Sequence, residues 1–177
     1  MKSTRLFFVC LVAVLCASCK SLHTVEGEYR FSDHPGNGLV VISTRIDNRC
    51  ENTMFSSGSL DFRSADGKTS GLFLLDNTFL AKDFQNPPGY FFVRSLPQGE
   101  YRILKLSFHG YKSNSEIGST FTVAAGQTTY LGEVFVGVPN CQGFAYRVVD
   151  MWSRDEQLLK KRVRNLATEQ VKKQVLR

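Results

Sequence analysis

Cysteine and histidine are the residue types through which this chain could do metal or nucleophilic chemistry, but their spacing favours neither. The three histidines, His23, His34 and His109, are dispersed and form no HxH or HExxH motif. Cys50 and Cys141 have no C-x-x-C partner, which argues against a zinc site or thioredoxin-type chemistry. No G-x-S-x-G elbow, P-loop or dinucleotide-binding G-x-G-x-x-G occurs. The sequence therefore predicts no catalytic residue, no cofactor and no metal site.

The first eighteen residues have the pattern of a cleaved export signal. Lys2 and Arg5 form a positive n-region, and Leu6–Cys16 forms an apolar h-region. As a helix these apolar residues would span about 16 Å, which is too short for a hydrocarbon core of about 30 Å. Residues 1–18 are therefore predicted to be a signal peptide and not a transmembrane anchor.

The stretch Leu15-Cys16-Ala17-Ser18-Cys19 resembles the bacterial lipobox, in which a cysteine follows two small residues and an apolar one. The resemblance implies that the Cys19 thiol receives a diacylglyceryl group and that cleavage follows Ser18. Cys16 is a departure, because leucine is more usual there, and an ordinary secretory signal is the alternative. Lys20 follows the cysteine, and by resemblance to the sorting rule of enteric bacteria this favours the outer membrane. The implied partner is thus a bacterial envelope membrane, held through lipidated Cys19.

Processing of this kind changes the meaning of the five cysteines. Cys10 and Cys16 would leave with the leader and Cys19 would carry lipid, so Cys50 and Cys141 remain in the folded part. In an oxidising compartment these two can form a disulfide, and two separate buried thiols are the alternative. The bond would close a loop of about ninety residues, for which the chain-entropy model gives roughly 4–5 kcal/mol.

The positive charge of the chain is concentrated at its C-terminal end. The formal net charge is +6, and residues 150–177 carry eight basic and four acidic side chains. Residues 19–149 carry twelve of each sign. A neutral body with a basic tail argues against nucleic acid as a partner, and it suits a solvated helix or one near an anionic surface.

Residues 38–150 are predicted to form one all-β domain, preceded by a short lead-in over 19–37. The strands are short and are separated by glycine- and proline-rich turns, which is typical of a sandwich or barrel. Leu39–Ile46 alternates like a half-buried strand, and the turn at Pro97–Gly99 is expected to close a hairpin. The predicted strands are Leu39–Ile46, Leu60–Arg63, Gly71–Leu80, Tyr90–Leu96, Tyr101–Phe108, Ser119–Val123, Thr128–Val138 and Phe144–Val149.

Residues 151–177 are predicted to form one amphipathic helix of about twenty residues. Glycine and proline are absent from its length, and Ser153 can act as the N-cap. Leu159, Val163 and Leu166 form an apolar stripe with helical spacing. We expect this stripe to dock on the β domain, and a free helix that awaits a partner is the alternative.

Two further stretches resemble known proteins. Leu96-Pro97-Gln98-Gly99-Glu100-Tyr101 resembles the LPxGxY turn of carboxypeptidase-regulatory-like and other transthyretin-like modules. Phe121–Gly132 is similar to the strand–turn–strand that follows this turn in small bacterial lipoproteins of uncharacterised function. The resemblance implies an immunoglobulin-like or transthyretin-like β-sandwich of about seven or eight strands with one C-terminal helix. Such modules are accessory domains, and no catalytic residue is carried over from them.

These observations predict a non-enzymatic envelope lipoprotein with a structural or protein-interaction role. Its partner would be another envelope protein, bound through a sandwich face or the C-terminal helix. The alternative is a glycan-binding module for peptidoglycan or surface polysaccharide, in which exposed tyrosines stack on sugar rings. Strand tyrosines are more often residues at the edge of a core, however. A hydrolytic enzyme is the least favoured hypothesis. The tyrosines concerned are Tyr90, Tyr101, Tyr130 and Tyr146.

Overall fold

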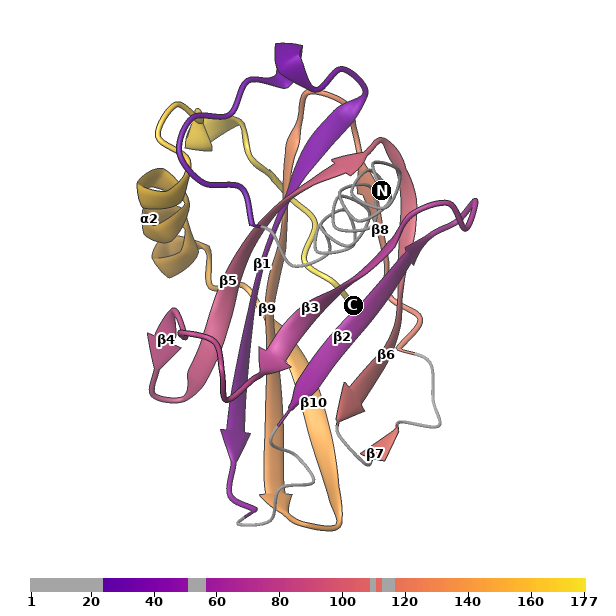
Figure 1. The fold of residues 1–177 in the computed structure, drawn as a ribbon, viewed down its shortest axis with the longest axis vertical. Coiled ribbons are helices and arrows are strands. Elements are labelled where there is room, and N and C mark those ends of the chain that lie inside the picture. Colours follow the sequence, from indigo (N-terminus) through magenta and orange to yellow (C-terminus); the bar gives the residue numbers. More distant parts are fainter. Residues whose placement is uncertain (1–23, 51–56, 109–110, 113–116) are drawn as a thin grey trace, which may run out of the picture.

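The computed structural model describes residues 24–50, 57–108, 111–112 and 117–177 as two β-sheets packed face to face, with an α-helix on the outside (Figure 1). The predicted signal peptide over residues 1–18, Cys19, His23 and His109 lie outside these described residues. The predicted all-β sandwich with a single C-terminal helix is confirmed. The strands are β1 (Asn37–Asn48), β2 (Gly58–Ser64), β3 (Ser70–Asp76), β4 (Phe84–Gln85), β5 (Pro88–Pro97), β6 (Gly99–Phe108), β7 (Tyr111–Lys112), β8 (Thr120–Val123), β9 (Thr128–Asn140), β10 (Gly143–Val149) and β11 (Lys172–Lys173). The helices are η2 (Phe31–Asp33), α2 (Trp152–Arg162) and η4 (Thr168–Gln170).

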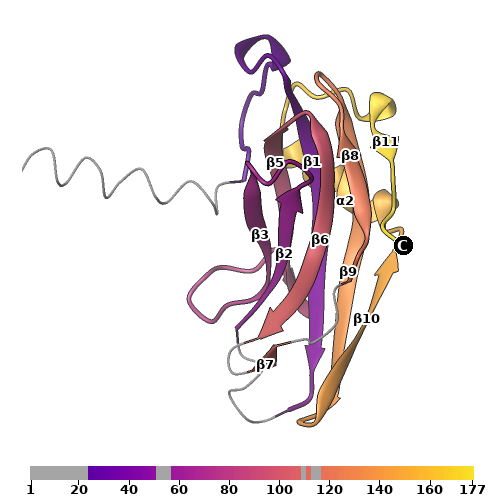
Figure 2. The same cartoon turned by 90° about the vertical axis from the view of Figure 1, so that its right-hand side faces the viewer.

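The first sheet is built around β1, which pairs antiparallel with β5 and parallel with β9. Its strand order is β10-β9-β1-β5-β4, and β11 adds to β9. The second sheet has the order β3-β2-β6-β7, with β8 also paired to β6. Figure 2 shows the two layers edge-on, with α2 and β11 on the outer side of the first sheet. The first sheet is therefore the middle layer wherever the C-terminal segment covers it.

Aromatic rings from the second sheet dominate the core between the layers. Phe62 stacks on Phe73 at a centroid distance of 4.8 Å, and Tyr101 stacks on Phe121 at 5.2 Å. All four side chains are at most 3% exposed. Burial of such a side chain contributes about 1.5–3 kcal/mol, so this cluster is a principal source of the sandwich's stability.

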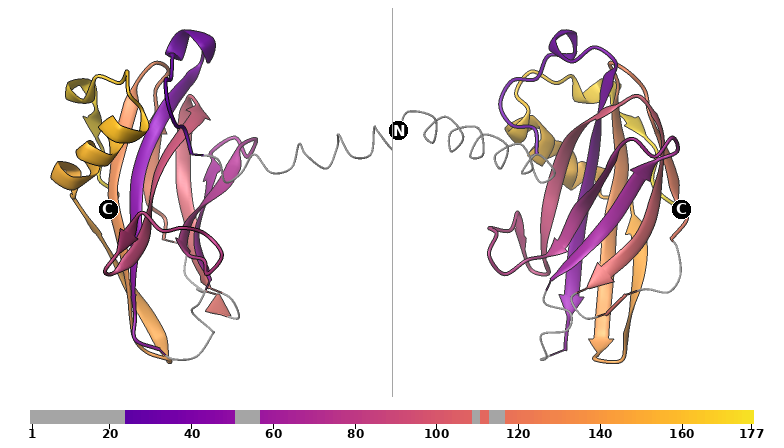
Figure 3. Two further views of the ribbon diagram at one scale, coloured as in Figure 1. Left: turned by 60° about the vertical axis from the view of Figure 1, so that its left-hand side comes forward. Right: turned by 45° about the vertical axis from the view of Figure 1, so that its right-hand side comes forward.

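The outer face of the first sheet is also buried, under α2, which lies against it in the left view of Figure 3. Leu39 and Val41 of β1 pack there with Leu159 and Val163 from the C-terminal stripe. The intervening residues of β1 point into the core between the sheets. The prediction that Leu39–Ile46 is half-buried is therefore wrong, because both of its faces are covered. The expected docking of the C-terminal stripe on the sandwich is confirmed.

Helix α2 ends at Arg162, so the prediction of a helix of about twenty residues is wrong in length. Val163 leaves the helical geometry and forms a parallel bridge with Gly27. The Asn165 side chain bonds to both backbone groups of Tyr29, at 2.9 Å to its N–H and 2.8 Å to its carbonyl. This pairing with the N-terminal segment outweighs the helix propensity of the residues that follow.

The turn at Pro97–Gly99 joins the two sheets and does not close a hairpin, so that prediction is wrong. Strand β5 belongs to the first sheet and β6 to the second. The Tyr101 hydroxyl donates to the Pro97 carbonyl at 2.8 Å across the corner. A tyrosine with this bond marks a corner between sheets in immunoglobulin-like sandwiches. The crossing lets Leu96 and Tyr101 both reach the central core.

Cys50 and Cys141 form a disulfide, with their Cα atoms 5.1 Å apart. Cys50 follows the end of β1 and Cys141 follows the end of β9, and these strands are parallel neighbours as far as Asn48 and Val138. The predicted pairing is confirmed, and the alternative of two separate thiols is wrong.

Candidate functional site

The chemistry-bearing residues of the sequence do not converge on one site. The structure brings Cys50 and Cys141 together as a disulfide. His34 is exposed and stacks on Tyr29 at a centroid distance of 4.9 Å. No group of three or more His, Cys, Asp or Glu side chains within the described ranges could hold a metal ion. Within the same ranges, no helix has the length and apolarity needed to cross a membrane.

The tyrosines proposed for sugar stacking do not form an exposed row. Tyr90, Tyr101 and Tyr130 are 4%, 2% and 0% exposed, whereas Tyr146 on the edge strand β10 is 43% exposed. Three of the four rings are thus unavailable to a sugar. Their hydroxyls bond inside the protein, as expected for residues at the edge of a core.

Burial of these tyrosines predicts a loss of stability at alkaline pH. Burial, with the nearby charge of Asp76, raises the pKa of Tyr90 to about 12, from a usual value of about 10. Below pH 10 the ring is neutral in both states. Between pH 10 and 12 the unfolded chain ionises first, so the free energy of unfolding should fall by about 2–3 kcal/mol through this group. Urea titrations at pH 9 and 12 measure the fall, and Tyr90→Phe should show a smaller one.

A polar cluster lies between α2 and the outer face of the first sheet. It consists of Ser43, Tyr130, Glu133, Arg154 and Asp155, of which all but Arg154 are at most 3% exposed. Asp155 accepts hydrogen bonds from Ser43 Oγ at 2.7 Å and from the Tyr130 hydroxyl at 3.0 Å. Arg154 Nε donates to Asp155 at 2.8 Å, and Nη1 donates to Glu133 at 2.6 Å.

A bulge in β9 sets the geometry of the polar cluster. Val41 is paired with Tyr130 and Ser43 with Glu133, so two residues of β9 oppose one residue of β1 between these pairs. Gly132 takes up the extra residue at φ +93°, a conformation that side chains with a Cβ rarely adopt. Tyr130 and Glu133 consequently face the same helix although they are an odd number of residues apart.

The electrostatics of the polar cluster favour a structural role. Burial lowers the pKa of Arg154, but the carboxylates of Asp155 and Glu133 outweigh this and raise it overall. The Arg154 guanidinium also lies over the Phe84 ring of β4 at 4.1 Å. Because the buried carboxylates are paired and bonded, the cluster fixes α2 on the sheet and leaves no group free for substrate.

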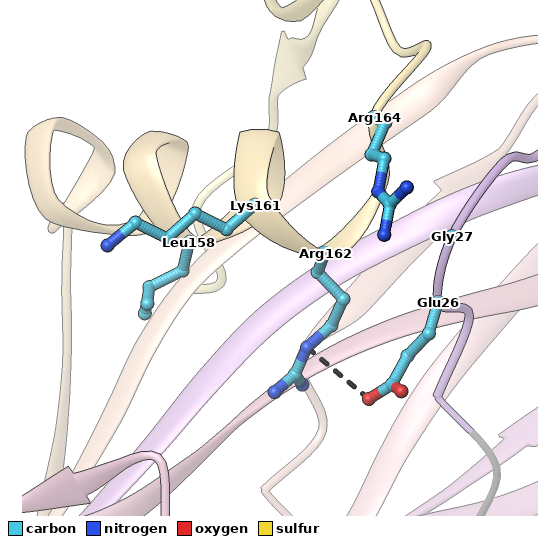
Figure 4. Close-up of a pocket in the computed structure, with 6 residues that line it drawn as sticks. All are labelled: Glu26, Gly27, Leu158, Lys161, Arg162 and Arg164. Atoms are coloured by element: carbon cyan, nitrogen blue, oxygen red, sulfur yellow. Dashed lines mark ion pairs between the residues drawn. The ribbon is translucent and has the colours of Figure 1, made fainter.

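A pocket of about 300 Å³ lies between the end of α2 and the N-terminal segment (Figure 4). Arg162 is committed to internal contacts: its side chain bonds Asp83 at 2.5 Å and the Phe91 carbonyl, and lies 3.8 Å from Glu26. Figure 4 shows the Arg164 guanidinium near the ion pair of Arg162 and Glu26, whereas the Lys161 ammonium points away from Glu26. The pocket is lined by Glu26, Gly27, Leu158, Lys161, Arg162 and Arg164.

The basic pocket can hold an anionic group. Lys161 and Arg164 form no ion pair with any residue in the described part of the chain. Arg164 offers a planar donor fork that matches a carboxylate or a phosphate. Glu26 is 68% exposed on its side chain, so water screens its competition for these cations.

An apolar tip, defined as residues 79–81 (Phe79-Leu80-Ala81), projects from the loop between β3 and β4. Phe79 is 94% exposed and Leu80 is 44% exposed. The strand predicted over Gly71–Leu80 is too long at its end, because β3 ends at Asp76. The turn-forming pair Asp76-Asn77 was the signal that could have placed the tip outside the sheet.

Comparison with known proteins adds no relative to this description. No known protein family, curated protein or solved structure matches the chain. The functional interpretation therefore depends on the predicted export signal, the sandwich, and the two surface features described above, the basic pocket and the apolar tip.

Proposed function

We propose that this protein is a non-enzymatic lipoprotein of the bacterial envelope, anchored through Cys19, whose sandwich contacts another envelope component. The observation that carries the proposal is the leader, which joins a positive n-region and a short apolar h-region to Ala17-Ser18-Cys19. The Cys50–Cys141 disulfide supports it, because such bonds persist in compartments outside the cytosol.

The folded part supports an interaction role. The polar cluster is closed and holds α2 rigidly, so the surface beside it is a fixed platform. The basic pocket on that surface suits an acidic side chain or a phosphate-bearing group of a partner. The residues that line it supply charge, but they include no serine, cysteine or histidine nucleophile.

The anchor is tested by replacing Cys19. The mature protein should carry acyl chains on Cys19, detectable by mass spectrometry, and should fractionate with membranes. Cys19→Ala should move the protein to the soluble fraction, because the remaining chain lacks the acyl groups that hold it. Replacing Cys50 and Cys141 together with alanine, which removes the disulfide and keeps Cys19, should leave membrane fractionation unchanged. Membrane association that is unchanged in the Cys19→Ala variant would contradict the assignment of a lipid anchor to Cys19.

A further inference from the structure

The apolar tip is an unusual surface for a folded domain in water. Phe79 exposes nearly its whole side chain, and Leu80 and Ala81 beside it are also exposed. Single exposed apolar residues are common, but a consecutive run held out at a loop end marks a contact surface. The tip is too small for the core of a stable protein interface, which buries about 800 Å² on each partner.

The loop that carries the tip is held at its base. Phe79 N–H donates to the Asn77 side chain at 2.8 Å, and the Tyr90 hydroxyl donates to the Asn77 carbonyl at 3.0 Å. Lys82 closes the loop through an ion pair with Asp76 at 2.6 Å, and both side chains are largely buried. The contacts that fix the loop therefore lie below the tip, and none of them draws Phe79 back toward the core.

The tip lies along the same strand as the start of the described chain. Thr24 and Val25 both bond to Val93 of β5, and Tyr90 of that strand bonds to the base of the loop. Val93 and Tyr90 are about 10 Å apart along the strand. Figure 2 shows the loop between β3 and β4 projecting away from the first sheet, on the side where the described chain begins.

The segment between Cys19 and Thr24, here called the tether, is short enough to keep the β5 side of the first sheet close to a membrane. Four residues separate Cys19 from Thr24, so the five Cα–Cα steps between the two can extend over at most about 18 Å. If Cys19 is lipidated, the β5 edge cannot move further than this from the bilayer surface. The unpaired cations of the basic pocket lie near the same tether, since the pocket includes Glu26. Their charge suits anionic headgroups.

We propose that the apolar tip inserts into the bilayer to which Cys19 is anchored and fixes the orientation of the sandwich on it. The proposal rests on the lipid anchor proposed above. Phe79 and Leu80 enter the boundary between headgroups and acyl chains, as aromatic and aliphatic side chains do in interfacial anchors. The tip thus supplies a second contact, which converts a flexible tether into a defined pose with the β5 edge toward the lipid.

The test uses the full mature lipoprotein in vesicles of phosphatidylethanolamine and phosphatidylglycerol. The mature chain should have no free thiol, because Cys19 is acylated and Cys50 is bonded to Cys141. Phe79→Cys therefore gives one site for an environment-sensitive fluorophore. Tyr146→Cys is the matched control, because Tyr146 is also an exposed aromatic but lies on β10, at the opposite edge of the first sheet.

The label at position 79 should show blue-shifted emission and be quenched several-fold less by aqueous iodide than the label at position 146. Equal quenching at the two positions, in protein shown by mass spectrometry to be acylated, overturns the insertion and leaves the anchor intact. Shielding at position 79 in native envelopes but not in protein-free vesicles identifies a protein contact and also overturns it. Absence of acyl groups on Cys19 is a separate result, which overturns the proposed function and the insertion together.

Discussion

Replacing Cys50 and Cys141 together with alanine is expected to lower the free energy of unfolding by about 4–5 kcal/mol. The two cysteines are 91 positions apart, so the bond removes much of the conformational freedom of the unfolded chain. In the folded state the bond joins the ends of two strands that are already parallel neighbours. The loss should therefore arise mainly in the unfolded state. Urea unfolding followed by circular dichroism measures it, and the m value should rise as the unfolded chain opens.

Reduction of the wild-type protein separates the cross-link from local packing. Cys50 is 8% exposed, so alanine removes some buried surface as well as the bond. Wild-type protein unfolded with a reductant keeps both side chains and loses only the cross-link. The chain-entropy argument requires most of the loss to appear in this measurement also. A loss below about 1 kcal/mol on reduction would contradict it.

Local patterns in the sequence predicted the elements of the sandwich but not how they are joined. Alternation and turn residues located Thr128–Val138 within β9 and Tyr101–Phe108 within β6, because a strand's own composition reflects its pleat. Whether a tight turn closes a hairpin or crosses between sheets depends on partners far away in the chain. The corner at Pro97 was therefore misassigned, although Tyr101, which pins it, was part of the recognised motif.

The length of the C-terminal helix was predicted wrongly for a related reason. The apolar stripe predicted docking correctly, but the end of the helix is decided by Gly27 and Tyr29, more than 130 positions earlier. Ser153 lies inside α2 and does not cap it; the Asp150 side chain accepts the hydrogen bond from the Trp152 N–H instead. No local pattern encodes such distant competition with helix propensity.

The polar cluster was not predicted, because the positions of its charged residues in the sequence could be explained without a buried ion pair. Asp155 lies at the start of the predicted helix, where an acidic residue suits the helix dipole, and Arg154 is one of the eight basic residues of the C-terminal region. Glu133 was the available signal, since it interrupts the apolar run of Thr128–Val138. A carboxylate inside a buried strand must find a cation, and here Arg154 supplies it.

Asp155→Ala is expected to lower the free energy of unfolding by about 3–5 kcal/mol, the second large effect. The carboxylate is fully buried, and its removal leaves Ser43 and Tyr130 without their shared acceptor. The Arg154 guanidinium is now paired with two carboxylates, those of Asp155 and Glu133. In the variant it would keep only Glu133 as a close carboxylate. That remaining pair places the expected loss nearer the lower end of the range.

Glu156→Ala is the matched control for this prediction, because it removes the same charge from the next position of the same helix. Glu156 pairs with Lys160 and accepts a hydrogen bond from the Thr168 hydroxyl, but water screens its charge, so its loss should cost clearly less stability than the loss of Asp155. The double variant with Tyr130→Phe and Asp155→Ala should lose less stability than the sum of the two single variants, because each substitution breaks the same hydrogen bond. Equal losses for Asp155→Ala and Glu156→Ala in urea titrations would show that α2 is held by its apolar stripe alone.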